Sequence, residues 1–140
     1  MREKLTLPAD RNSLADVSEL VERYAGFVHL SVTELHDVQV AVAEACTNAI
    51  VHGLHEDSSR TFEFEIESDY NTLTITIREN GTPYVMEEVA PVDLTSTWMN
   101  RKIGGLGIYL INELMDSAKF STEPGGLKVV RMTKNAKRVG

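Results

Sequence analysis

Two neighbouring segments of the chain alternate strictly between apolar and polar residues, and this pattern constrains the fold most. They are TFEFEIE, residues 61–67, and TLTITIR, residues 72–78. Because successive side chains of a β-strand point to opposite faces, each segment predicts a strand with one dry face and one wet face. Phe62, Phe64 and Ile66 are predicted to face the core, and the glutamates that alternate with them to face solvent. The short stretch SDYN between the segments predicts a hairpin.

Helical periodicity marks the chain before these strands. Apolar residues recur at helical spacing over residues 13–28, where Gly26 is expected to end the helix. A second helix is predicted to begin after Ser31, because Glu34 follows at the spacing of a capping box. This second helix is expected to stop near Gly53.

Four further segments complete the predicted architecture. Strands are predicted over residues 3–8, 117–122 and 127–134, and a glycine-led helix over residues 105–116. The order is then strand, two helices, two strands, a loop, a helix and two strands. This order predicts an α/β two-layer sandwich, in which helices cover one face of a mainly antiparallel sheet. Since no repeat or linker is visible, we expect one domain over residues 1–140.

The composition excludes several classes of protein. Asp and Glu number 21 against 14 Lys and Arg, a formal net charge of −7, which argues against generic nucleic-acid binding. The one cysteine, Cys46, allows no internal disulfide and is expected to be a small core residue of the second helix. No apolar run follows Met1, and no stretch approaches the roughly 20 apolar residues of a membrane span. We therefore expect a cytoplasmic protein without membrane contact.

The second helix carries a carboxylate and an amide in an otherwise small and apolar run. Glu44 and Asn48 lie four residues apart, so they share one helix face, and Ala41 and Ala45 beside them allow close approach. A carboxylate there can deprotonate a hydroxyl or water, and an amide oxygen can ligate Mg²⁺. The alternative is that Glu44 points to solvent and Asn48 bonds locally, and spacing alone favours that alternative.

Two glycine-containing segments are the next candidates. ENGTP, residues 79–83, follows a predicted strand and can present a carboxylate to a ligand while the backbone turns away. GGLG, residues 104–107, opens the third helix, where backbone amides and the positive end of the helix dipole can approach phosphate. An ordinary Asn-Gly turn and a flexible hinge with a helix cap are the alternatives.

Three further residues have weaker signals. Thr133, near the end of the last predicted strand, could bond a base or a buried water, although a threonine is also an ordinary strand former. His52 and His55 have H-x-x-H spacing, for which solvated or capping roles are favoured over a metal site.

The order of the motifs is more specific than any one of them. EACTNAIVHG (44–53), ENGTPY (79–84) and GGLGIYLINELMD (104–116) together resemble the GHKL ATPase superfamily, which has the Bergerat fold. Their particular forms resemble its small branch, the anti-sigma-factor serine kinases of bacterial partner-switching systems. In that branch the first motif is close to EAxxNAxxHG, and Pro83 fits the frequent replacement of a glycine.

This resemblance implies an Mg-ATP site. Asn48 would ligate Mg²⁺, and Glu44 would be the general base that acts on a serine hydroxyl or on water. Gly81 would allow close approach to adenine, and residues 85–104 would form a lid over ATP. The other nucleotide-binding positions implied by the resemblance are His52, Glu79, Pro83, Arg101, Lys102, Gly104, Gly105, Leu106, Gly107, Ile108 and Thr133.

One position departs from the family pattern. The family has an aspartate where this chain has Glu79, and that aspartate accepts a hydrogen bond from the adenine amino group. Glutamate keeps the acceptor but adds a methylene, and Arg78 beside it could compete for the carboxylate. A lost hydrogen bond to a charged acceptor costs roughly 1.5–3 kcal/mol, which is about one to two decades in affinity.

The resemblance also implies a function. We expect an ATP-dependent protein-serine kinase and anti-sigma factor, which phosphorylates a STAS-type antagonist and binds a sigma factor or a similar regulator. A homodimer is expected from the family, with Phe27, Leu30 and the first helix as a candidate apolar face. The alternative is a nucleotide-sensing binding module without phosphotransfer, which Glu79 motivates. An interaction domain without any ligand would not account for the ordered motifs.

Overall fold

The computed structural model describes residues 1–82 and 105–137. Within these ranges lie five strands, three α-helices and one π-helical segment. In chain order they are β1 (Arg2–Pro8), α1 (Ser13–Phe27), α2 (Val32–Thr47), η1 (Asn48–Gly53), β2 (Thr61–Asp69), β3 (Thr72–Glu79), α3 (Gly105–Leu114), β4 (Ser117–Glu123) and β5 (Leu127–Asn135). Each predicted strand and helix is therefore present, with ends that shift by a few residues.

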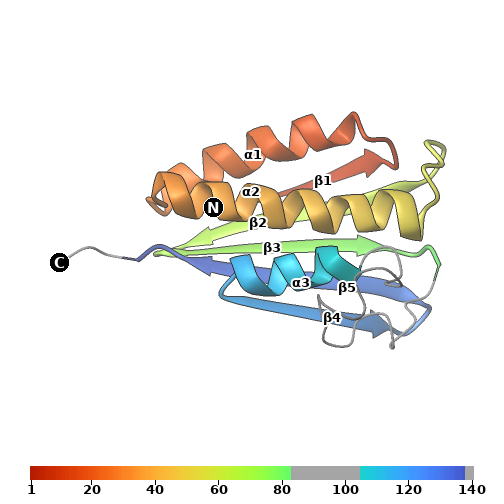
Figure 1. The fold of residues 1–140 in the computed structure, drawn as a ribbon. Coiled ribbons are helices and arrows are strands. Elements are labelled where there is room, and N and C mark those ends of the chain that lie inside the picture. The colour runs from red at the N-terminus through yellow and green to blue at the C-terminus, as the bar shows by residue number, and fades with distance from the viewer. Residues whose placement is uncertain (83–104, 138–140) are drawn as a thin grey trace.

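The described strands form one antiparallel sheet in the order β1-β2-β3-β5-β4. The predicted hairpin joins β2 to β3 through a turn at Tyr70, whose φ of 59° is left-handed. A second hairpin joins β4 to β5, where Gly125 and Gly126 adopt φ values of 89° and 83° that favour glycine. The helices lie on one side of the sheet (Figure 1), so the predicted two-layer α/β sandwich is confirmed.

The helix-covered face of the sheet is apolar, as the alternation predicts. Phe64, Ile66, Leu73, Ile75 and Met132 are fully buried and point into this core. Burying each such side chain contributes roughly 1.5–3 kcal/mol. Cys46 is buried in the same core, as expected, and burial raises the pKa of its thiol to about 12.

The opposite face of the sheet is polar, but one of its glutamates is not solvated. Glu65 is only 9% exposed, although it lies on the predicted wet face. Arg78 Nη1 lies 2.7 Å from Glu65 Oε1, and Arg2 Nε lies 2.6 Å from Glu65 Oε2. The hydrogen bond from Arg78 lowers the pKa of Glu65 from its ordinary value. Glu65 does lie on the predicted outer face, but it is not solvated because side chains of the two neighbouring strands, β1 and β3, cover it.

The helix ends follow local capping chemistry. Glu34 N–H donates to Ser31 Oγ (3.1 Å), and Ser31 N–H donates to Glu34 Oε1 (2.8 Å), so the predicted capping box is confirmed. Helix α1 runs through Gly26 to Phe27, one residue beyond the predicted end. In the part of the chain that the structure describes, no helix has the length and hydropathy of a membrane crossing.

Candidate functional site

The helix that carries Glu44 changes its winding at Asn48. Helix α2 ends at Thr47, and the segment from Asn48 to Gly53 is π-helical. Leu54 N–H accordingly donates to the carbonyl oxygen of Ala49, five residues earlier (2.9 Å). Short π segments often occur at functional sites. The predicted end at Gly53 is confirmed, whereas the periodicity of the sequence did not reveal the π winding.

The structure brings Glu44 and Asn48 together with Gly107. A Cβ placed on Gly107 would lie 2.9 Å from Glu44 Oε2 and 3.6 Å from Asn48 Nδ2. The first turn of α3 therefore rests directly on the face that Glu44 and Asn48 share, and a side chain at Gly107 would displace the carboxylate. Ala41 and Ala45, the small residues beside Glu44 in the sequence, are buried.

This group has the chemistry of a site for a metal-bound triphosphate. Glu44 and Asn48 are both half-buried. Among the described residues, no hydrogen bond or ion pair engages the Glu44 carboxylate, so it is available to a ligand. An amide oxygen suits Mg²⁺, and the first amides of a helix suit phosphate oxygens. The residues present at this end therefore fit Mg²⁺ and the phosphates of ATP.

Glu79 lies at the other end of the candidate site, where β3 stops. It is 6% exposed and lies opposite Lys128 in the register of β3 and β5. Glu79 Oε1 is 2.9 Å from Lys128 Nζ, and the side chain of Lys128 is 1% exposed. The backbone N–H of Gly81 donates to Glu79 Oε2 (2.6 Å). Both oxygens of this carboxylate are therefore engaged inside the protein.

Two glycines close around the Glu79 carboxylate. A Cβ on Gly53 would lie 2.7 Å from Glu79 Oε2, and a Cβ on Gly81 would lie 2.8 Å from the same atom. Thr82 N–H donates to the carbonyl oxygen of Gly53 (2.9 Å), which ties the end of η1 to the segment after β3. The close approach that Gly81 permits here is to Glu79 and to the backbone of Gly53.

Arg78 does not compete for Glu79, and that expectation was wrong. Its guanidinium is bound to Glu63 (3.3 Å) and Glu65 (2.7 Å) on the polar face of the sheet. Adjacent residues of a strand point to opposite faces. Glu79 accordingly lies on the helix-covered face and is out of reach of Arg78.

The structure does not bring Thr133 to Glu79. Lys128 and Thr133 are separated by an odd number of positions along β5, so their side chains lie on opposite faces of the sheet. The Thr133 hydroxyl is hydrogen-bonded to the hydroxyl of Ser117 on β4. Lys128 was missed by sequence reasoning because lysine is rarely buried. The alternation that puts Lys128 on the same face as Val130 was the available signal.

The remaining predicted positions divide into two groups. Gly105 is the first residue of α3, Ile108 is buried, and His52 lies half-buried in η1. Leu106 belongs to α3 by its backbone. Pro83, Arg101, Lys102 and Gly104, together with the expected lid at residues 85–104, lie outside the described residues.

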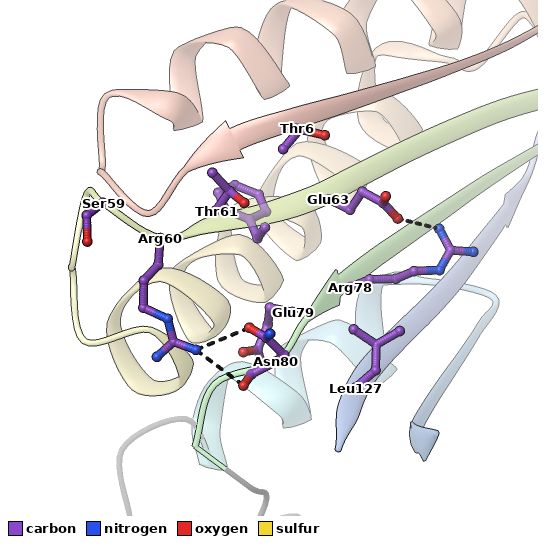
Figure 2. A pocket seen from close by; sticks show the side chains of 10 residues that line it. Thr6, Ser59, Arg60, Thr61, Glu63, Arg78, Glu79, Asn80 and Leu127 are labelled. Atoms are coloured by element: carbon purple, nitrogen blue, oxygen red, sulfur yellow. Dashed lines mark hydrogen bonds and ion pairs between the residues drawn. The ribbon is translucent and has the colours of Figure 1, made fainter. Parts of the chain in front are cut away.

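A hollow of about 440 Å³ near the start of β2 and the end of β3 was not predicted. Figure 2 shows Arg60 directed at Asn80 and Arg78 directed at Glu63 along its wall. Arg60 Nη2 lies 3.1 Å from Asn80 Oδ1, and Arg78 is held by its glutamates. None of Glu44, Asn48 or Gly107 lines this hollow, whereas Glu79 is one of its lining residues.

Comparison with known proteins identifies the family. The sequence matches the histidine kinase-like ATPase domain over residues 7–134. The chain belongs to this family. It is 30% identical over 139 residues to the serine-protein kinase RsbW of Halalkalibacterium halodurans, which covers 96% of this chain and 83% of the relative. It is 35% identical over 121 residues to the RsbW of Listeria monocytogenes, which covers 82% of this chain and 74% of the relative.

These matches confirm the predicted resemblance to GHKL ATPases and their serine-kinase branch. Solved structures agree at the level of fold. The RsbU and RsbW domains of a Mycobacterium tuberculosis protein superpose with a TM-score of 0.68 at 15% identity, covering all of this chain and 35% of that one. This chain therefore spans about a third of that structure's chain. The SiaB–SiaC complex of Pseudomonas aeruginosa gives a TM-score of 0.56 at 15% identity, covering 94% of this chain and 88% of that one.

Proposed function

We propose that this chain is a cytoplasmic, Mg-ATP-dependent protein-serine kinase that phosphorylates a STAS-type antagonist. We further propose that the kinase binds a sigma factor or a similar regulator when no antagonist is bound to it. The observation that carries the proposal is the contact of Gly107 with Glu44 and Asn48, which places a carboxylate and an amide at the start of a helix. The names of the bacterial serine-protein kinases that the chain resembles support it.

Each residue of this group has a proposed role. Mg-ATP, when bound, supplies the γ-phosphoryl group and a divalent charge. The Asn48 side-chain oxygen would hold the metal, and the amides at the start of α3 would hold phosphate oxygens. The Glu44 carboxylate would take the proton of the target serine hydroxyl as that oxygen bonds to the γ-phosphorus and the bond to the bridging oxygen breaks, so that ADP leaves. Arg101 and Lys102 are proposed to neutralise the γ-phosphate.

We also propose that the kinase is a homodimer. Phe27 at the end of α1 is 41% exposed and packs edge-on against Tyr24, so an apolar ring is presented at this end of the helix. Sedimentation of the wild type beside Phe27→Glu tests this point. We expect the wild type to sediment as a dimer and the variant to shift toward monomer. A wild type that is monomeric at all concentrations contradicts the dimer.

One observation favours a second candidate, a nucleotide-sensing binding module without phosphotransfer. The carboxylate of Glu79 is bound to Lys128, so the residue expected to read the base is engaged elsewhere. Glu44 distinguishes the two candidates, because a binding module has no need of a general base.

Calorimetry with ATP tests the proposed site. The wild type is titrated with ATP in Mg²⁺ and again in EDTA, beside Asn48→Ala and the control Asn12→Ala. Asn12 is exposed at the start of α1 and makes no side-chain capping bond. We expect Mg²⁺-dependent binding that Asn48→Ala weakens about tenfold to a hundredfold and Asn12→Ala leaves unchanged. Equal effects of the two variants, or binding indifferent to Mg²⁺, would contradict the site.

Transfer to protein tests the reaction. The wild type is incubated with Mg-ATP and a STAS-domain protein from the same genome, and phosphoserine is measured by mass spectrometry. We expect one modified serine on the STAS domain. Tight ATP binding without any phosphoserine would favour the binding module.

A further inference from the structure

We propose that Lys134 is a positioning residue of the kinase, which anchors the end of α3 so that Gly107 at its start stays on Glu44 and Asn48. The inference rests on the proposed function, since it concerns the same site. The sequence gave Lys134 no role, because the candidate chosen near the end of β5 was its neighbour Thr133.

The first support is the contact between Lys134 and the last residue of α3. Lys134 Nζ donates to the carbonyl oxygen of Leu114 (2.6 Å). The last carbonyl groups of a helix have no partner within the helix and form its negative end, so an ammonium group there supplies both a donor and an opposite charge. The side chain of Lys134 is 8% exposed, so water competes little for this contact.

The second support is that three successive residues of β5 hold the end of α3. Asp116 N–H donates to the carbonyl oxygen of Thr133 (2.9 Å), and Asn135 N–H donates to Asp116 Oδ2 (2.6 Å). Lys134 lies between them and binds Leu114. Because hydrogen bonds are directional whereas the burial of apolar surface is not, these contacts fix the position of α3 along its own axis.

The third support is that Lys134 joins α3 to the same helix that carries Glu44. Lys134 Nζ lies 3.5 Å from Asp37 Oδ2 on α2. Asp37 lies seven positions before Glu44 in α2. Leu114 lies seven positions after Gly107 in α3, and the two helices run in opposite directions (Figure 1). The same interval of about two helical turns therefore separates the two contacts on each helix.

The consequence concerns the register of α3 on α2. A slide of α3 along its axis would carry Gly107 away from the Glu44 carboxylate, together with the amides that are proposed to hold phosphate. Catalysis depends on such placement, since a shift of about 1 Å can slow a reaction by about a hundredfold. The contacts of Lys134 with Leu114 and Asp37 lie about two turns from the site, so Lys134 acts through α3.

Nuclear magnetic resonance of the ligand-free, isotope-labelled chain tests the position of α3. Lys134→Met keeps most of the apolar stem and removes the ammonium group. We expect it to shift the backbone amide resonance of Gly107 and the side-chain amide resonance of Asn48. The matched control Lys119→Met, at an exposed position on β4, should shift neither. An unmoved Gly107 resonance in a folded Lys134→Met overturns the inference and leaves the proposed kinase standing.

Phosphotransfer to a STAS-domain protein tests the consequence. At saturating Mg-ATP, Lys134→Met should lower kcat by about tenfold to a hundredfold, whereas Lys119→Met should keep the wild-type kcat. A folded Lys134→Met with the wild-type kcat overturns the inference. Absence of transfer by the wild type contradicts the proposed kinase, and the Gly107 resonance, which needs no nucleotide, still decides whether Lys134 positions α3.

A second variant keeps the inference testable if Lys134→Met does not fold. Asp37→Asn removes the link to α2 but leaves the contact with Leu114, and the side chain of Asp37 is 27% exposed. We expect it to shift the Gly107 amide resonance, whereas Asp16→Asn, at an exposed position in the first turn of α1, should not. An unmoved Gly107 resonance in Asp37→Asn then overturns the inference.

Discussion

Glu44 in α2 is half-buried and, among the described residues, its carboxylate has no hydrogen-bond or ion-pair partner. Glu79 at the end of β3 is 6% exposed, and both of its oxygens are bound within the protein. The two carboxylates belong to one motif set, yet the fold leaves one available to a ligand and uses the other to satisfy Lys128. The place of a carboxylate in a sequence motif therefore does not show by itself whether that carboxylate is available to a ligand or stabilises the fold.

The largest expected effect separates the two glutamates by activity. Glu44→Ala should lower the rate of phosphotransfer by about 10²–10⁴-fold, the range for loss of a general base, while ATP still binds. Its free energy of unfolding should stay within about 0.5 kcal/mol of wild type. Phosphoserine formation and urea unfolding measure the two quantities, with Glu22→Ala on the exposed side of α1 as the control. Unchanged transfer in Glu44→Ala would show that Glu44 is not the base.

The second-largest effect is on stability, and here Glu79 rather than Glu44 is the sensitive residue. Glu79→Gln removes the carboxylate that lies 2.9 Å from the buried Lys128 ammonium, so the free energy of unfolding should fall by roughly 1.5–3 kcal/mol. Urea unfolding measures it. The uncharged pair Glu79→Leu with Lys128→Met should recover much of the loss, because a well-packed apolar pair replaces a buried ion pair at little cost. If Glu79→Gln were as stable as Glu44→Gln, the carboxylate of Glu79 would contribute no more to stability than that of Glu44, which would contradict the comparison.

The third effect probes the space that keeps Glu44 in place. A methyl group at Gly107 would meet the Glu44 carboxylate at 2.9 Å, so Gly107→Ala should move that carboxylate and slow phosphotransfer about a hundredfold. Gly26→Ala is the matched control, since a methyl group there meets no atom of the described residues within 4 Å. The control should raise stability by roughly 0.5–1 kcal/mol and leave the rate alone. Equal phosphotransfer rates in Gly107→Ala and Gly26→Ala would show that the start of α3 has no role in the reaction.

The smallest effect adds a third carboxylate, on the polar face of the sheet. Arg78 lowers the pKa of Glu65 on folding, so the interaction stabilises the fold above the ordinary value of 4.5 and is lost as the pH falls below it. Glu65→Gln should therefore cost about 1 kcal/mol at neutral pH and much less near pH ~3. Urea unfolding at both pH values measures the difference. A loss of unfolding free energy in Glu65→Gln that grows on acidification would contradict the lowered pKa of Glu65.

The sheet and helices were predictable because their signals are local. Strict alternation over residues 61–67 and 72–78 allowed one assignment of faces, and the spacing of Ser31 and Glu34 marked the start of α2. The meeting of Glu44 with the glycine-led helix was expected from the order of motifs, since spacing alone left it open. The structure adds the contact with Gly107 that gives this expectation a physical basis.

The surroundings of Glu79 were not predictable because they depend on the register between distant segments of the chain. Thr133 was chosen from its place near the end of a strand, whereas the pairing of β3 with β5 puts Lys128 opposite Glu79. A lysine in a strand is usually solvated, so the alternation that puts Lys128 on the same face as Val130 indicated its burial but not its partner. The burial of Glu65 was missed for the same reason, because its cover comes from Arg2 and Arg78 on neighbouring strands.

The most direct test locates the metal. Mn²⁺ takes the same oxygen ligands as Mg²⁺ and broadens nearby nuclear resonances. Isotope-labelled protein with ATP is titrated with substoichiometric Mn²⁺, and broadening is followed at every assigned amide. We predict that the side-chain amide of Asn48 and the backbone amide of Gly107 broaden first and that Glu79 and Lys128 broaden later. Broadening centred on the hollow at Arg60 and Arg78, or spread without a centre, would contradict the account.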